Sequence, residues 1–152
     1  LGLITPDVDA LRERLGLPGM RVIQFGFGGG EDNPHRLENH PRDAVAYTGT
    51  HDNPTVVQWW AGADDGVRAA VDAAAAAAGI DEPEPHRRMV RLALSSNAAL
   101  AIVPAQDLLG LGADARFNTP VPAAGDRESR LQPGPLARPP APRARHSTHA
   151  AS

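Results

Sequence analysis

The run from Tyr47 to Asn53 constrains the fold of this chain more than any other segment. It completes a short apolar stretch, residues 44–48, whose length and composition are typical of a buried β-strand. Gly49 then introduces a turn, after which His51 and Asp52 stand side by side. In α/β barrels the catalytic carboxylates lie at the carboxyl ends of the strands. The run therefore predicts an α/β fold with a functional site at this strand end.

Strands and helices are predicted to alternate on both sides of this run. Upstream, a strand end over 1–4, a helix over 6–15 and a strand over 21–27 form the kind of unit from which parallel sheets are built. The apolar residues of that helix share one face: Val8, Leu11 and Leu15. Downstream, periodicity predicts helices from residue 53 or 55, over 65–78 and over 85–96, a strand over 100–103 and a short helical segment over 106–110. Three or four strands are too few to close a barrel, which needs eight.

The last part of the chain differs in composition. Several of the 15 prolines lie beyond residue 121, where they alternate with arginines and apolar periodicity is lost. Such a segment cannot bury enough apolar surface to offset the entropy of ordering the backbone. We therefore expect an ordered portion over residues 1–120 and a disordered Pro/Arg-rich tail over residues 121–152.

Charge and composition argue against several classes of partner. The formal net charge of -3 does not favour nucleic acid, because a phosphate-binding groove needs clustered lysine and arginine on a folded face. The sequence has no apolar stretch near the ~18 residues of a membrane span, and its start is unlike a signal peptide. It also has no cysteine, which suits the cytoplasm. We expect a cytoplasmic protein that binds neither nucleic acid nor membrane.

The side chains of His51 and Asp52 allow three interpretations. In a glycosyl-transfer site, a carboxylate acts as nucleophile, acid or transition-state stabiliser, and a neutral imidazole donates to sugar hydroxyls. In a metal-dependent hydrolase, His51 would need two or more further ligands, for which His35 and His40 are candidates without diagnostic spacing. The third interpretation is a purely structural pair. The residue types alone leave all three open.

Four motifs, in this order, resemble the amylomaltase family, the disproportionating 4-α-glucanotransferases. They are LGLITP at residues 1–6, GLPGMRVIQF at 16–25, YTGTHDN at 47–53 and AIVPAQDLLGL at 101–111. The resemblance covers about residues 1 to 120. It ends where the family continues with Gly-Asn-Trp-x-Trp-Arg, because this chain has GDRESR at 125–130 and neither tryptophan.

The resemblance implies the C-terminal part of a (β/α)₈ TIM barrel that acts on malto-oligosaccharides and other α-1,4-glucans. The implied reaction is a retaining transfer of glucan segments, without cofactor or metal. By resemblance, Asp52 is the third catalytic carboxylate, which stabilises the transition state, and His51 is the adjacent substrate-binding histidine. Asn118 matches a position near the acceptor sugars. The family's aspartate nucleophile and glutamate acid/base fall outside this sequence, since the glutamate comes just before Leu1.

The chain opens without an initiator methionine and within an expected strand, so we expect that its beginning is missing. On this interpretation the fragment is inactive alone, and the missing N-terminal part of the barrel is a candidate partner. The alternative is a catalytically inactive remnant that binds sugar weakly. A metal-dependent hydrolase is the other enzyme class left open.

Overall fold

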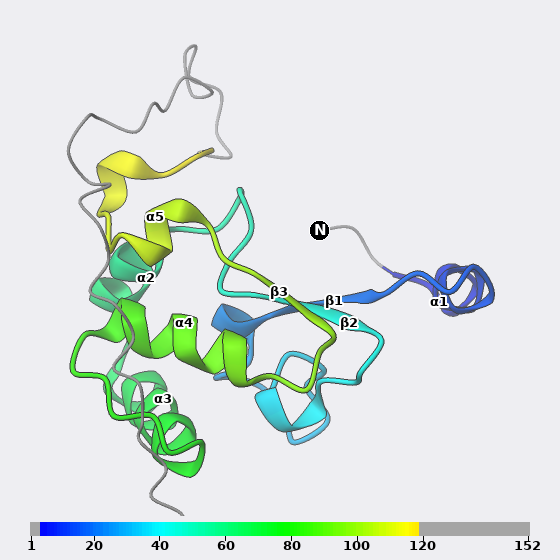
Figure 1. Cartoon of the computed structure of the whole chain (residues 1–152), viewed down its shortest axis with the longest axis horizontal. Helices are drawn as coiled ribbons and strands as arrows, with labels where there is room; N and C mark the ends of the chain where they lie inside the picture. The colour runs from blue at the N-terminus through cyan, green and yellow to red at the C-terminus, as the bar shows by residue number, and fades with distance from the viewer. Residues whose placement is uncertain (1–3, 119–152) are drawn as a thin grey trace, which may run out of the picture.

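A three-stranded parallel sheet organises the structure, a computed structural model that describes residues 4–118. The strands are β1 (Gly19–Val22), β2 (Ala44–Tyr47) and β3 (Leu100–Ile102), in the order β1-β2-β3 (Figure 1). Gly19 lies opposite Ala44, and Val45 opposite Leu100. Because neighbouring strands are parallel, helices and loops must return the chain to the same edge each time. The predicted α/β class is thereby confirmed.

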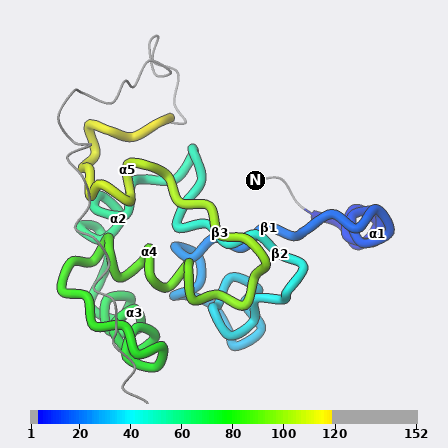
Figure 2. Tube along the Cα trace, viewed as in Figure 1, coloured from blue at the N-terminus to red at the C-terminus, as the bar shows by residue number. Residues whose placement is uncertain are grey.

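The helices gather mainly at one end of the molecule. They are α1 (Pro6–Arg14), α2 (Val56–Gly62), α3 (Asp65–Ala77), α4 (Pro85–Ser95) and α5 (Ala105–Leu108), with short 3₁₀ turns at Ile23–Phe25, Leu37–Asn39 and Ala113–Ala115. The Cα trace in Figure 2 shows α2, α3 and α4 together, with α1 alone at the opposite end. The predicted helices over 65–78 and 85–96 are confirmed to within one residue.

The core lies between α2, α3, α4 and the turn after β1. Its buried side chains are Ile23, Val56, Val71, Met89, Leu92 and Ala93. On the sheet, Ala44 and Ala46 are fully buried, and α4 contacts both β2 and β3. Small side chains at these strand positions leave room for a helix to lie close to the sheet. This packing holds β2 firmly, and β2 carries the candidate site at its end.

The other face of the sheet is covered only in part. It carries two rows of residues in register: Met20, Val45 and Leu100, then Val22, Tyr47 and Ile102. Met20, Leu100 and Ile102 are 41%, 54% and 44% exposed. Parallel sheets in whole domains are covered on both faces. Val22 is fully buried, so within residues 4–118 this apolar face is covered at the end of β1 and exposed at Met20, Leu100 and Ile102.

Helix α1 begins as predicted, at Pro6 after the N-cap Thr5. Its end is a Schellman motif, in which Leu17 N donates to Arg12 O at 3.0 Å and Gly16 has φ of 63°. The apolar residues that the sequence placed on one face of this helix, Val8, Leu11 and Leu15, are all exposed within the described residues. The cause is that α1 contacts the rest of the chain mainly through polar groups.

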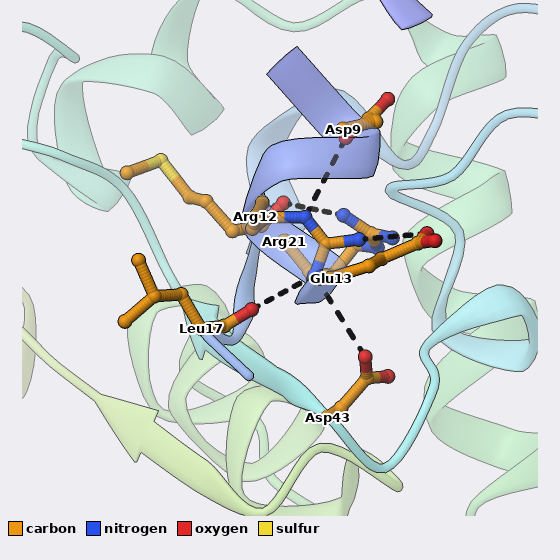
Figure 3. A network of polar contacts seen from close by, with 7 residues as sticks. Asp9, Arg12, Glu13, Leu17, Arg21 and Asp43 are labelled. Carbon is orange, nitrogen blue, oxygen red and sulfur yellow. Dashed lines mark hydrogen bonds and ion pairs between the residues drawn. The ribbon is translucent and has the colours of Figure 1, made fainter. Parts of the chain in front are cut away.

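Arg12 makes most of these polar contacts (Figure 3). Its guanidinium lies 3.5 Å from Asp9, 3.3 Å from Glu13 and 3.7 Å from Asp43, and donates to Leu17 O at 2.9 Å. Asp43 directly precedes β2, so the arginine joins α1 to the start of that strand. Exposed ion pairs of this kind contribute little each, so they orient α1 without anchoring it firmly.

The strand predicted over 21–27 is wrong at both ends. β1 starts at Gly19 and stops at Val22, and a 3₁₀ turn follows at Ile23–Phe25. The reason is the length of its neighbour, because β2 offers partners only as far as Tyr47, opposite Val22. The remaining predicted elements are confirmed within about two residues. The expected tail over 121–152 lies outside the described residues, as does the strand end predicted over 1–4 except for Ile4, which is not in a strand.

Candidate active site

The loop between β2 and α2, residues 49–55, is called the site loop below. At its start, a Cβ on Gly49 would lie 2.8 Å from Gln24 Nε2 and 3.2 Å from Asn53 Cβ, so this position has no room for a side chain. Asn53 Oδ1 accepts hydrogen bonds from Thr50 N at 2.9 Å and Thr50 Oγ1 at 2.7 Å. At its end, Thr55 caps α2 by accepting from Gln58 N. These bonds give the loop a defined turn between two fixed ends.

The site loop presents His51 and Asp52 to solvent. Their side chains are 66% and 49% exposed, and His51 Nε2 lies 3.4 Å from Asp52 Oδ1. Asn118 Nδ2 donates to the same Oδ1 at 2.5 Å, although it lies 66 positions further along the chain. Arg116 Nη2 donates to the Asp52 carbonyl at 2.8 Å. The structure therefore brings together the three site residues that the sequence predicted, and adds Arg116.

Two cavities adjoin this group. One, of about 260 Å³, is lined by residues that include Thr50, His51, Gln106 and Phe117. The other, of about 680 Å³, has a lining that includes the aromatics Phe25, Phe27 and Trp59 and the polar Gln24, Gln58 and Arg116. Within the described part of the chain, the buried acceptors Gln24 Oε1 and Gln58 Oε1 have no hydrogen-bond partner. A cavity lined by both aromatic and polar side chains suits a ligand that has apolar faces and hydroxyl groups.

Beneath the site loop lies Asp107, which is 2% exposed. Its Oδ2 accepts from Thr48 Oγ1 at 2.5 Å and its Oδ1 from Val56 N at 2.7 Å. Burial raises the pKa of this carboxyl, and the two hydrogen bonds oppose the rise. Sequence reasoning gave Asp107 no role, although the sequence shows an acidic residue three positions after Pro104 and directly before the apolar pair Leu108-Leu109.

His35 and His40 hold the long loop after β1 and are not directed at the site. His35 Nδ1 accepts from Val22 N at 3.0 Å. His40 Nε2 contacts His35 O at 3.1 Å, and His40 Nδ1 lies 2.7 Å from Ser96 Oγ. Since a carbonyl oxygen only accepts, Nε2 carries the proton and Nδ1 accepts from the hydroxyl. Burial lowers the pKa of both imidazoles.

These contacts bear on the metal-dependent alternative. Both ring nitrogens of His40 are already engaged, as is Nδ1 of His35. Over residues 4–118 there is no group of three or more His, Asp or Glu side chains able to hold a metal ion. The expectation that His35 and His40 could complete a metal site with His51 is therefore wrong for the part of the chain that is described.

Over residues 4–118, no helix is long and apolar enough to cross a bilayer.

A parallel sheet with a carboxylate and an imidazole at one strand end defines an α/β protein with an enzyme-like site. Comparison with known proteins gives the family. Residues 1–132 match the sequence model described as 4-alpha-glucanotransferase. The chain is 46% identical over 126 residues to the chloroplastic/amyloplastic 4-alpha-glucanotransferase DPE1 of Arabidopsis thaliana, covering 83% of this chain and 22% of that protein. It is 44% identical over 141 residues to the 4-alpha-glucanotransferase of Thermus thermophilus, covering 90% and 28%.

A solved structure is similar as well. It is the amylomaltase from Streptococcus agalactiae in complex with acarbose, with a TM-score of 0.78, 27% identity, and coverage of 91% of this chain and 28% of that one. The chain belongs to the 4-α-glucanotransferase family. It spans between 22% and 28% of the length of these relatives. The matched range ends at residue 132, inside the segment from residue 121 that we expected to form a tail.

Proposed function

We propose that this chain contributes Asp52 to a 4-α-glucanotransferase that moves α-1,4-glucan segments between malto-oligosaccharides. The observation that carries the proposal is the group at the end of β2. There the half-exposed Asp52 carboxylate lies beside His51 and Asn118 at the edge of a cavity. Family membership supports the reaction class.

The geometry of Asp52 suits a role in stabilising a transition state. One oxygen, Oδ1, is held by Asn118 and lies near His51, whereas Oδ2 has no hydrogen-bond partner among residues 4–118. A carboxylate fixed on one side can accept hydrogen bonds from sugar hydroxyls on the other. Such bonds favour glycosyl transfer when they strengthen as the oxocarbenium-like transition state forms. In this proposal His51 and Asn118 bind substrate.

The larger cavity, whose lining includes Pro54 of the site loop, offers a place for glucosyl units. Sugar rings have apolar faces, which pack on aromatic side chains such as Phe25 and Trp59. Their hydroxyl groups can form hydrogen bonds with polar side chains of the cavity lining, which include Gln24, Gln58 and Arg116. Arg116 lines this cavity and also binds the Asp52 backbone, so a sugar placed here would reach the site loop. Malto-oligosaccharides are therefore the proposed ligands.

The fold and domain proposal follows from the open sheet. We propose that residues 1–120 are the C-terminal portion of a (β/α)₈ barrel and that residues 121–152 form a separate tail. Three parallel strands with one apolar face that is only partly covered are the arrangement expected of a few barrel strands without the others. The cytoplasm remains the proposed compartment, whereas the Arabidopsis relative is named as chloroplastic/amyloplastic.

The proposal requires two further carboxylates, because a retaining transfer needs a nucleophile and an acid/base. Asp107, the other carboxylate beside the site loop, is buried with both oxygens engaged. We therefore propose that the 152-residue chain alone does not catalyse transfer and that a polypeptide carrying the rest of the barrel completes the site.

The test is incubation with maltotriose and analysis for glucose and longer malto-oligosaccharides. The chain alone is expected to give no products, and co-expression with the remaining portion of the Thermus thermophilus enzyme is expected to give them. In that mixture Asp52→Asn should abolish products, while Asp65→Asn on the exposed start of α3 should not. Products from the chain alone, or full activity in Asp52→Asn, would show that the proposed site is wrong.

A remnant that binds sugar without turnover is the second candidate, favoured by the small share of the relatives that the chain covers. Titration of the chain with acarbose, followed by tryptophan fluorescence, separates the two. Saturable binding together with no products in the co-expressed mixture would favour the remnant. Products in the mixture would exclude it.

A further inference from the structure

We propose that Asp107 is a positioning residue that orients Asp52 by holding both ends of the site loop with one carboxylate. The inference rests on the proposed function, because it explains how the chain directs Asp52 toward a sugar. Asp107 itself lies beneath the loop and is nearly inaccessible, at 2% exposed.

The two contacts of Asp107 bracket the site loop. Thr48, which donates to Oδ2 at 2.5 Å, is the residue before the loop, and Val56, whose N–H donates to Oδ1 at 2.7 Å, is the residue after it. Thr48 ends β2 and Val56 begins α2. One planar group therefore sets the distance between the two ends of the loop that carries Asp52.

A carboxylate in this position is costly unless both oxygens have partners. Removing an ionised carboxylate from water is strongly unfavourable, and hydrogen bonds to the charged form offset part of that cost. Each oxygen here has one donor, and both donors come from the ends of the loop. Loss of either donor would leave a buried charge underpaired, so the clamp resists opening.

The element that carries Asp107 is itself fixed in place. Asp107 lies in the single turn of α5, and its N–H donates to Pro104 O at 3.0 Å. Gly110, just after this turn, lies against the ring of His86 so closely that a Cβ would be 2.8 Å away. α5 also contacts α4, which packs in the core. The contacts of α5 with α4 therefore fix the position of Asp107, and Asp107 in turn holds the two ends of the site loop.

The same residue shapes the smaller cavity, which it lines together with His51 and Phe117. If the clamp opened, the loop ends could separate, and both the cavity and the direction of Asp52 would change. A merely structural residue would lower the stability of the whole fold. A positioning residue changes the order of the site loop beyond any change elsewhere.

Four variants of the full chain separate these roles. Asp107→Leu retains similar volume but offers no acceptor, and Thr48→Val removes one donor with little change of shape. Asp107→Asn can keep both contacts, because its carbonyl accepts from Val56 N–H and its amide donates to the Thr48 hydroxyl oxygen. Val71→Ala is the control, since it lowers stability in the core from α3, an element that carries no residue of the clamp.

The experiment measures amide hydrogen exchange by NMR across the 152-residue chain, with a parallel acarbose titration. In Thr48→Val, which loses one buried hydrogen bond, residues 49–56 should exchange about tenfold faster relative to amides of α3 and α4, and in Asp107→Leu, which loses two, the acceleration should be at least as large. Acarbose should bind these two variants about tenfold more weakly. Asp107→Asn should behave as wild type in both measurements, and Val71→Ala should raise exchange uniformly.

The outcomes distinguish the two proposals. Unchanged relative exchange of the site loop in Thr48→Val, or a uniform increase like that of Val71→Ala, would overturn the role of Asp107. If Asp107→Leu does not fold, Thr48→Val and Asp107→Asn still decide the question. Failure of the wild-type chain to bind acarbose would count against the proposed function, while the exchange data would still report on the clamp.

Discussion

Replacing Gly49 by alanine is the sharpest test of how the site loop leaves the sheet. The new Cβ would lie 2.8 Å from Gln24 Nε2, closer than van der Waals contact allows. Gln24 cannot simply move away, because it is 5% exposed and its Nε2 donates to Pro54 O at 3.0 Å. The substitution must break that bond or displace the loop.

The magnitude follows from these two costs. Loss of the hydrogen bond is worth about 0.5 to 1.5 kcal/mol, and forcing extra atoms into a packed site costs about 1 to 3 kcal/mol. We therefore expect Gly49→Ala to lower the free energy of unfolding by about 2 to 4 kcal/mol. The assay is urea unfolding followed by far-UV circular dichroism, with the midpoint and slope compared between variants.

Gly62→Ala is the matched control. Gly62 ends α2, and a Cβ there would meet nothing within 4 Å, so alanine should be neutral or stabilising by up to about 1 kcal/mol. In a Gln24→Ala background the cost of Gly49→Ala should shrink, because the main clash is removed. Equal stability of Gly49→Ala and wild type, or an equal loss in Gly62→Ala, would refute the steric argument.

Two further predictions concern stability. Because burial lowers the pKa of His35 and His40 below 6.5, the folded chain binds fewer protons than the unfolded chain. The free energy of unfolding should therefore fall as the pH drops below about 6.5 toward the lowered values; urea unfolding at pH 7.5 and pH 6 tests this, and no fall in the midpoint would contradict it. Met89→Ala in the core should cost about 2 to 5 kcal/mol, whereas Leu94→Ala on the exposed side of the same helix should cost little. Similar urea midpoints for these two variants would show that the assigned core is wrong.

The local sequence predicted most of the elements, because their signals lie within a few residues. Pro6 after Thr5 and Thr55 before Val56 mark helix starts that the structure confirms. The end of β1 was missed for the opposite reason. Apolar residues continue to Phe27, but a strand persists only where a neighbouring strand offers partners, and that depends on β2.

The candidate site was predictable in part. His51 and Asp52 are adjacent in sequence and follow a strand, so local reasoning located them, and the family motif added Asn118. Their roles in substrate binding and catalysis stay predictions. Arg116 was missed, because its contact with the Asp52 backbone links positions 64 residues apart. A local sequence pattern does not indicate contacts between such distant residues.

By itself, the sequence determined the parallel α/β class, the strand that ends in His51 and Asp52, and the family to which the chain belongs. These follow from periodicity, turn residues and motif order, which are properties of neighbouring residues. Only the tertiary structure decided that Asn118 donates a hydrogen bond to Asp52 and that α1 leaves its apolar face exposed. It also decided that Asp107 accepts hydrogen bonds from both Thr48 and Val56. The physical reason is that hydrogen bonding and burial depend on which distant segments pack together, and that packing is settled by the whole fold.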